Sequence, residues 1–398
     1  MFKSDLSQMK PVDYVIAGLP LVLIFIRIYG VPITYDEAFT YNQYVIKHRP
    51  FHLNVANNHI LNSILIMMTT VFKSYSEVLI RLPNFLMLVA AVLFTLKYTM
   101  ARGSRHFGLV VSLLFSSYFI AEFYGLARGY TMSMCLNLMA LYKYPYESKQ
   151  DLKHGNILFF LAVLSSLSSL FLYLGFLTLV LLNFIKSGKK LDSWYRKFGV
   201  WNFVAILLFY YWGQKITQAT DPLYKADTVW EGLSIFFTSL YSTRYALGVW
   251  LVVVPVGMAY TIYRDRGKGV FIFLLLCLSV GYSALPSLII ENKGFIIGRS
   301  WIPYFPLFIL PVMELVFRGK WATRRGSYIL SSLLGACIIF SSFYPYSSRN
   351  LRSFWQDNTM DHDVLMEEGC ERKQVPHLDF YKKKYNLTPK PCTSSSGG

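Results

Sequence analysis

Two acidic residues, Asp36 and Glu37, stand side by side directly after the first long apolar run of the sequence. An acidic pair at a membrane boundary costs free energy unless it is hydrated, paired with a cation or used in chemistry. A carboxylate in such a position can act as a general base and take the proton of a hydroxyl group. It can equally serve the backbone, because Asp36 can cap a short helix over residues 36–46 and Glu37 favours the positive end of that helix. Catalysis and capping are both open for this pair.

Several further polar and charged residues stand between later apolar runs, where they can gather on one face of a membrane protein. They are Asn58, His59, Glu122, Arg128, Tyr130, Lys293 and Arg299. Arginine side chains bind phosphate oxygens in a bidentate fashion. Arginines beside carboxylates therefore fit the transfer of a group from a lipid-anchored phosphate. A salt bridge between Glu122 and Arg128, or an interfacial anchor at Arg299, would explain the same residues structurally.

The elements that must position these residues are apolar helices. Hydrophobic residues make up 54% of the 398-residue chain and charged residues only 15%, whereas a soluble chain carries about a quarter charged residues. Apolar runs near the length that crosses a bilayer, about twenty residues, recur along the sequence. Soluble folds are thereby excluded, and the sequence predicts an all-α polytopic membrane protein. The net charge of +17 lies in short clusters between these runs, which indicates membrane topology and not nucleic-acid binding.

The basic clusters set the predicted topology. They lie at 3–10, 102–105, 143–153, 186–197, 264–268 and 318–325. If all of them face the cytoplasm, as positively charged loops usually do, an even number of crossings separates each pair. This pattern predicts about eleven transmembrane helices, with Asp36, Arg128 and Arg299 on the outer side.

Two stretches need a special arrangement to keep this parity. The apolar run 60–72 is short for a span and carries Asn62 near its start, so we place it along the outer membrane surface. Residues 32–77 then form one long first exoplasmic loop with interfacial helices. The apolar stretch 157–186 lies between two basic clusters and is expected to form a hairpin, whose tip is the serine cluster at 165–169.

The chain thus divides into two parts. Residues 1–345 form the transmembrane domain, and residues 346–398 form a small polar tail on the exoplasmic side. Cys370 and Cys392 both lie in this tail. In an oxidising compartment they would form a disulfide that closes a loop of about twenty residues and contributes on the order of 3 kcal/mol. Two free thiols are the alternative.

Five short motifs follow one another along the chain. They are Asp36-Glu37, Asn58-His59-Ile60, Arg81-Leu82-Pro83, Ala127-Arg128-Gly129-Tyr130 and Arg299-Ser300-Trp301-Ile302-Pro303. Their order resembles the polytopic membrane glycosyltransferases of the C-type fold, especially the protein O-mannosyltransferase and aminoarabinose-transferase-like group. The resemblance covers residues 1–150 well, the late span loosely and the tail not at all. Phe39, Ile60 and Leu126 depart from the residues usual in that family.

This resemblance implies an inverting glycosyltransferase that moves a sugar from a polyprenyl-phosphate donor to an acceptor hydroxyl. The protein would lie in the bacterial cytoplasmic membrane, with its site facing the periplasm, and Asp36 would be the catalytic base. Four basic residues would bind the donor phosphate: Arg128, Arg299, His59 and Lys293. Four polar residues would orient the acceptor: Glu37, Glu122, Asn58 and Tyr130. Pairing with an arginine is the other role open to the two glutamates.

Partners and other function classes follow from the same residues. The expected partners are the lipid-linked sugar, the bilayer and a lipid, glycan or protein acceptor, with no nucleic acid. No cofactor is assigned: the carboxylates are suitable ligands for a divalent metal, but none has the spacing of a dedicated metal site. A transporter or flippase of lipid-linked sugars is the main alternative, although we find no inverted repeat of the kind common in transporters. A structural membrane subunit is a third possibility.

Overall fold

Helices make up almost all of the structure, and its described residues contain no β-strand. The structure is a computed structural model. It describes residues 11–30, 33–52, 59–101, 123–146, 148–187, 193–219, 228–241, 244–289 and 298–318, together with single positions at 111, 114, 117, 120, 380, 383 and 384. The predicted all-α class is confirmed for this part of the chain.

Three helices of the described part are long and apolar enough to cross a membrane. They are α5 (Glu77–Ala101), α10 (Leu170–Lys186) with the turn before it, and α14 (Arg266–Ile289). On α10, Leu181 and Ile185 are 57% and 64% exposed. Exposed apolar faces of this kind suit a lipid environment, so these helices are compatible with membrane association.

The apolar stretch 157–186 folds as a helical hairpin, as the basic clusters on either side of it lead one to expect. Its first leg is α9 (Lys149–Ser165), which ends where Ser166 takes an extended backbone conformation. A 3-10 turn, η2 (Leu167–Ser169), then leads into α10. Lys149 and Lys186, at the far ends of the two legs, line one groove. The legs are therefore antiparallel, with the serines at the tip.

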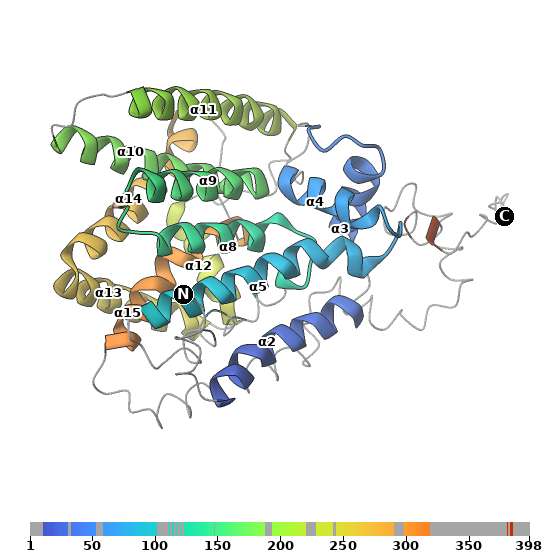
Figure 1. Ribbon diagram of the computed structural model, residues 1–398, viewed down its shortest axis with the longest axis horizontal. Coiled ribbons are helices and arrows are strands. Elements are labelled where there is room, and N and C mark those ends of the chain that lie inside the picture. Colours follow the sequence, from blue (N-terminus) through green and yellow to red (C-terminus); the bar gives the residue numbers. More distant parts are fainter. Residues whose placement is uncertain are drawn as a thin grey trace, which may run out of the picture.

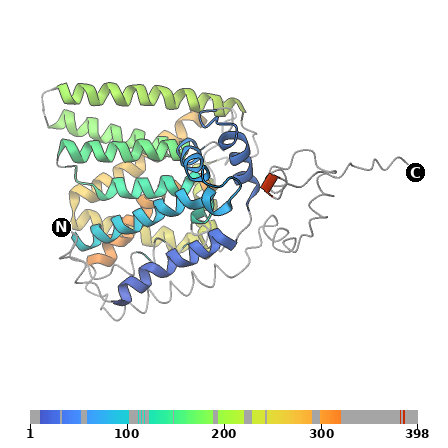
Figure 2. The same ribbon diagram turned by 45° about the vertical axis from the view of Figure 1, so that its right-hand side comes forward.

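Several helices lie one beside another in a row, which Figures 1 and 2 show from two sides. The row begins with α2 (Pro11–Gly30) and continues through α5, α8 (Gly129–Tyr142) and α9 to α11 (Ser193–Ala219). α8 is central in this row and is buried along almost its whole length. Side chains that extend from its two ends therefore lie at opposite ends of the bundle.

The later helices pack behind this row. They are α12 (Val229–Tyr241), α13 (Arg244–Arg264), the 3-10 helix η4 (Gly298–Tyr304) and α15 (Phe305–Arg318). Between the end of α11 at Ala219 and the start of α13 at Arg244, α12 is a further helix that the charge pattern alone does not predict. α12 is only 13 residues long, so it escapes a search for apolar segments of spanning length.

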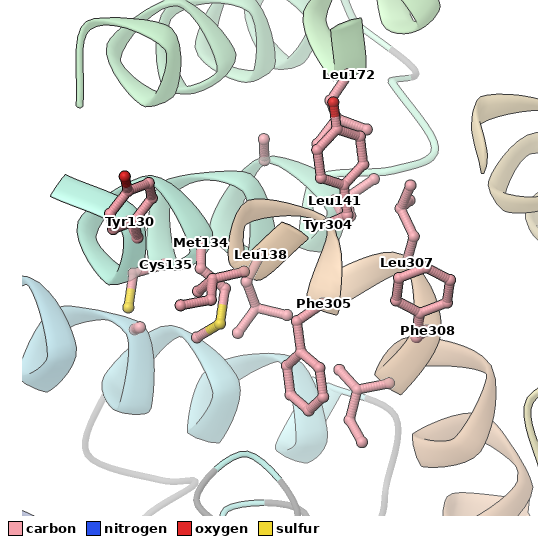
Figure 3. Close-up of a cluster of buried hydrophobic side chains, with 14 of the residues drawn as sticks. Tyr130, Met134, Cys135, Leu138, Leu141, Leu172, Tyr304, Phe305, Leu307 and Phe308 are labelled. Atoms are coloured by element: carbon pink, nitrogen blue, oxygen red, sulfur yellow. The ribbon is translucent and has the colours of Figure 1, made fainter. Parts of the chain in front are cut away.

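The core is centred where α8 meets the start of α15. Figure 3 shows Met134 and Leu138 of α8 pointing toward Phe305, and all three belong to one buried apolar cluster. Trp301 of η4 is fully buried in the same cluster. Burial of these large side chains fixes η4 and α15 against α8.

The segment after α2 forms short helices at one end of the row, on the right in Figure 1. α3 (Tyr35–Thr40) continues directly into a short π-helix, η1 (Tyr41–Val45). α4 (Ile60–Thr70) has 11 residues, fewer than the roughly twenty that cross a bilayer. The end of the bundle that carries Asp36 is therefore built from short elements.

Candidate functional site

α3 begins one residue before Asp36 because Thr34 caps it. The Thr34 hydroxyl accepts a hydrogen bond from the Glu37 backbone N–H at 3.4 Å, and the Glu37 carboxylate accepts one from the Thr34 backbone N–H at 2.9 Å. This reciprocal arrangement is a capping box. Of the two alternatives left open for Asp36, capping of this helix is therefore excluded, because Thr34 is the cap. The spacing Thr34-x-x-Glu37 is the sequence signal that would have identified the cap.

Glu37 forms a fully buried ion pair with Arg81 of α5. The guanidinium donates from Nε to one carboxylate oxygen at 2.8 Å and from a terminal nitrogen to the other at 2.7 Å, and both side chains are 0% exposed. Arg81 also donates to the Ile28 carbonyl of α2 at 3.2 Å. Of the two roles considered for Glu37, pairing with an arginine is the one these contacts show. The partner, Arg81, was not among the site residues predicted from the sequence.

Glu37 also holds the backbone of a distant loop. Its Oε1 accepts a hydrogen bond from the Ala127 N–H at 2.6 Å. Burial alone would raise the pKa of Glu37, but the charge of Arg81 and the hydrogen bonds from Arg81, Ala127 and Thr34 outweigh it and bring this pKa below its ordinary value. Glu37 therefore remains ionised, and it joins α3, α5 and the loop before α8.

Two asparagine side chains fasten the same loop from its other side. Asn62 of α4 donates to the Ala127 carbonyl at 2.9 Å. Asn84 of α5 donates to the carbonyls of Leu126 and Arg128, at 2.5 and 3.0 Å. Buried backbone groups need such partners outside regular helices. These contacts fix the backbone immediately before α8, and with it the position of Arg128.

Arg128 reaches from this loop to Asp36. One terminal nitrogen of its guanidinium lies 2.7 Å from Asp36 Oδ2; the Arg128 side chain is 1% exposed and that of Asp36 is 27% exposed. The guanidinium carbon also lies 5.6 Å from the centre of the Tyr130 ring. The structure thus brings together the predicted base and the predicted phosphate ligand, with the carboxylate on the accessible side. A partly exposed carboxylate beside a buried cation can exchange protons with a bound molecule.

His59 connects this site to the tip of the serine hairpin. Its Nδ1 lies 2.7 Å from the Ser165 carbonyl oxygen, and because a carbonyl only accepts hydrogen bonds, Nδ1 carries the proton. The ring packs edge-on against Tyr130 at 4.8 Å between centroids. A Cβ on Gly129 would lie 1.8 Å from the same Ser165 oxygen. Only glycine fits there, so the loop, the hairpin tip and His59 meet in direct contact.

The element that carries Arg299 is fastened to the same hairpin. Asn137 of α8 donates to the Pro303 carbonyl of η4 at 2.9 Å and to the Ser169 hydroxyl at 3.1 Å. Tyr304 donates from its hydroxyl to the Ser168 carbonyl at 2.7 Å. The backbone of Arg299 belongs to η4, whereas its side chain lies outside the described part. The hairpin tip therefore links η4 to the loop that carries Arg128.

A second charged cluster is buried near the other end of the bundle. Lys268 of α14 lies 2.6 Å from Glu314 of α15, with side chains 1% and 3% exposed. Tyr98 of α5 donates to the same glutamate oxygen at 2.7 Å, and its ring lies 4.6 Å from the Lys268 ammonium. In the sequence analysis Lys268 counted only as part of a basic cluster that sets topology. The structure instead gives it a buried carboxylate partner.

The structure brings five of the predicted site residues together: Asp36, Glu37, His59, Arg128 and Tyr130. Six other candidates have side chains outside the described residues: Asn58, Glu122, Lys293, Arg299, Cys370 and Cys392. Within the described ranges, no group of three or more histidine, cysteine, aspartate or glutamate side chains is arranged to hold a metal ion. Arg81, Asn62 and Asn84 are the site residues that sequence reasoning missed, and their signal is polarity inside apolar runs. No protein-family model, curated protein or solved structure matches this chain.

Proposed function

We propose that the protein is an inverting glycosyltransferase that moves a sugar from a polyprenyl-phosphate donor to an acceptor hydroxyl. The observation that carries this proposal is the Asp36–Arg128 pair, in which a partly exposed carboxylate lies 2.7 Å from a buried guanidinium. Such a pair supplies the two groups that the transfer needs. One takes the proton of the attacking hydroxyl, and the other stabilises the charge of the departing phosphate.

The two residues would act in the same step, one on the acceptor and one on the leaving group. The acceptor oxygen forms a bond to the anomeric carbon as the bond from that carbon to the phosphate oxygen breaks. The hydroxyl proton passes to Asp36, and the lipid phosphate leaves with its negative charge stabilised by the Arg128 guanidinium. In the resting site Asp36 and Arg128 neutralise each other. A donor phosphate would compete with Asp36 for the guanidinium. Donor binding would thereby free the carboxylate to contact the acceptor hydroxyl.

The surrounding contacts support a preorganised site. The Glu37–Arg81 pair and the amides of Asn62 and Asn84 hold the loop that presents Arg128. In such a site the charged and polar groups are already held in place, so little free energy is spent on reorienting them during the reaction. This preorganisation is the main source of electrostatic catalysis. In the proposal Arg299 and Lys293 complete the phosphate site.

The remaining candidates take supporting roles in the proposal. His59, which the resemblance assigns to the donor phosphate, contacts Tyr130 and the hairpin tip, and in the proposal it holds both in place beside that phosphate. Tyr130, Asn58 and Glu122 orient the acceptor, which is a lipid, a glycan or a protein. The enzyme would have about eleven transmembrane helices, with residues 32–77 as the first exoplasmic loop and the site on the periplasmic side of a bacterial cytoplasmic membrane.

The test measures polyprenyl phosphate released from a polyprenyl-phosphate sugar by the purified full-length protein in lipid nanodiscs. Asp36→Asn is nearly isosteric and should lower release by about 100-fold or more, while donor binding persists. Arg128→Lys should weaken donor binding, because an ammonium cannot form the bidentate contact. Asp151→Asn, a substitution of the same chemistry at a half-buried position at the other end of the bundle, serves as the matched control. Release by Asp36→Asn at the wild-type rate would rule out the assignment.

A transporter or flippase of lipid-linked sugars is the second candidate, and the buried Lys268–Glu314 pair favours it. Ionisable groups inside apolar helices often mark a transport or proton path. The same preparation distinguishes the two functions. A transporter would move an intact fluorescent polyprenyl-phosphate sugar across a vesicle membrane without releasing polyprenyl phosphate, whereas the transferase would release it.

A further inference from the structure

A groove opens at the end of the bundle opposite the Asp36–Arg128 site. Its volume is about 1150 Å³, and its walls are the starts of α9, α11 and α14, the end of α10 and the turn at residues 144–146. An adjoining hollow of about 600 Å³ shares Ser148 and Lys149 with it and adds Lys153 and His154. The two hollows are neighbours, and the proposed sugar transfer uses neither.

The charge of the groove is positive. Three cations line it, Lys149, Lys186 and Arg266, and the described lining residues include no acidic side chain. The nearest described acids are engaged in helix caps: Asp151 accepts from the Ser148 hydroxyl at 2.7 Å, and Asp265 accepts from the Lys268 backbone N–H at 3.1 Å. The groove therefore favours an anionic occupant.

The position of these cations points to a membrane lipid. Lys186 is the last residue of α10 and Arg266 the first residue of α14, and both helices are long and apolar enough to cross a membrane. Cations at the ends of such helices lie at the depth of the lipid headgroups. They are therefore placed to meet a phosphate that is attached to an acyl chain.

The walls beneath the cations are apolar. Leu179, Phe271 and Leu274 line the groove below the level of the charges, and on the outward face of α10 Leu182 and Ile185 are 52% and 64% exposed. An acyl chain that leaves the groove along α10 would cover this exposed apolar surface. One molecule with an anionic head and an apolar tail satisfies both parts of the groove.

We propose that this groove binds an anionic phospholipid, with its phosphate between Lys149, Lys186 and Arg266 and its acyl chains along α10 and α14. Basic pockets between transmembrane helices bind anionic headgroups through such charges. The Lys149 ammonium lies 5.3 Å from the centre of the Tyr195 ring, a cation–π contact that helps to hold this lysine at the groove. This inference does not depend on the proposed sugar transfer.

Native mass spectrometry of the full-length protein, with phosphatidylglycerol or phosphatidylcholine of matched acyl chains added, tests the site. The wild-type protein should retain phosphatidylglycerol more strongly than phosphatidylcholine. The variant with Lys149→Gln, Lys186→Gln and Arg266→Gln should bind phosphatidylglycerol about 100-fold more weakly, at about fivefold for each cation lost. Its phosphatidylcholine binding should not change.

A matched triple variant separates this site from the general charge of the surface. Lys97→Gln, Arg196→Gln and Lys197→Gln remove the same charge from exposed positions that do not line the groove, and they should leave phosphatidylglycerol binding within about twofold of wild type. Equal losses in both triple variants would overturn the proposal. Full displacement of the lipid by soluble glycerophosphate would also overturn it, because it would indicate a site for a free anion. A dimer mass that is lost only in the groove variant would overturn it too, because it would indicate that a second copy of the chain occupies the groove.

Discussion

Asp36 and Glu37 are neighbours in sequence but have different surroundings, because successive residues of a helix point about 100° apart. Glu37 faces Arg81 and is fully buried, whereas Asp36 faces Arg128 and is partly exposed. Burial decides what each carboxylate can do: Glu37 is committed to four hydrogen-bond donors, and Asp36 remains accessible to a ligand. One position of the acidic pair therefore serves the fold, and the other can serve chemistry.

This division predicts different costs for two conservative substitutions. Glu37→Gln leaves the Arg81 guanidinium buried without a countercharge and should destabilise the protein by about 3–5 kcal/mol. Asp36→Asn also leaves a buried guanidinium, that of Arg128, without its countercharge, but the partly exposed position of Asp36 lets water reach the pair, so it should cost less, about 1–3 kcal/mol. Thermal unfolding in one detergent, followed by circular dichroism, measures both. Equal loss of stability in the two variants would contradict the assignment of Glu37 to the fold.

The pH dependence of stability provides an independent check on Glu37. Its pKa in the folded protein lies below its ordinary value of 4.5, so the folded state holds the proton less tightly than the unfolded state does. The corresponding stability is present above about pH 4.5 and is lost as the pH falls through the lower, folded pKa. The wild-type protein should therefore lose more unfolding free energy below about pH 4.5 than Glu37→Gln does. Parallel pH profiles for the two proteins would show that Glu37 is not the responsible group.

Sequence reasoning found part of the site at this scale. The charge pattern placed Asp36 and Arg128 on the same outer face, and the resemblance to the C-type-fold glycosyltransferases implied a shared function for them. It missed the Glu37–Arg81 pair, whose members are 44 residues apart, because spacing along the chain does not show which helices become neighbours. The capping box at Thr34 is a local pattern, and it was available in the sequence.

At the scale of elements, the site depends on the junction between the hairpin tip and the start of α8. Gly129 allows this junction, since a Cβ there would lie 1.8 Å from the Ser165 carbonyl oxygen. Contacts this short can be relieved only by moving backbone, because neither partner is a flexible side chain. The helix and the hairpin can therefore approach each other only through a residue without a side chain.

Gly129→Ala should therefore destabilise the protein by about 1–3 kcal/mol through overpacking. Gly248→Ala in α13 is the matched control, because no atom lies within 4 Å of the Cβ it would add. There alanine should be neutral or stabilise the helix by up to about 1 kcal/mol. Melting temperatures of the two variants in the same detergent check this pair. A stable Gly129→Ala protein would mean that the junction is looser than described.

The charge pattern predicted some elements well and others poorly. The hairpin over 157–186 followed from parity alone, because two basic clusters at one end require an even number of legs between them. Parity did not predict α12, because a segment of only 13 residues fits a loop, a core helix or an interfacial helix equally well. The charge pattern therefore predicts the ends of long helices well, but it does not predict the number of short helices between them.

At the scale of the whole molecule, the described part of the tail returns to the end of the bundle that carries the site. Phe380 packs against Tyr41 and Tyr75, with ring centroids 5.6 and 5.4 Å apart. Lys384 lies 2.6 Å from Glu77 at the start of α5. The sequence predicts only a small polar tail over residues 346–398, whereas these described residues of it contact the helices around Asp36.

Phe380→Ala should therefore loosen the first loop more than the rest of the bundle. Truncating a buried phenylalanine to alanine lowers the free energy of unfolding by about 3–5 kcal/mol, and Phe380 is fully buried. Hydrogen exchange of peptides that cover 35–45 and 71–80 should become faster in this variant, while α9 and α10 keep their wild-type rates. Lys383→Ala, at an exposed position beside Lys384, is the control. Unchanged exchange near Tyr41 would show that the tail does not support the loop.

The buried Lys268–Glu314 pair also constrains how the protein is made. If α14 and α15 insert into a bilayer, each charge alone would be costly there, yet the two residues are separated by 46 positions and belong to different helices. A ribosome adds about 5–20 residues per second, so α14 waits several seconds for its partner from α15. During that time the insertion machinery would have to shelter one unpaired ion. We therefore expect α14 and α15 to leave that machinery for the lipid together, as one unit.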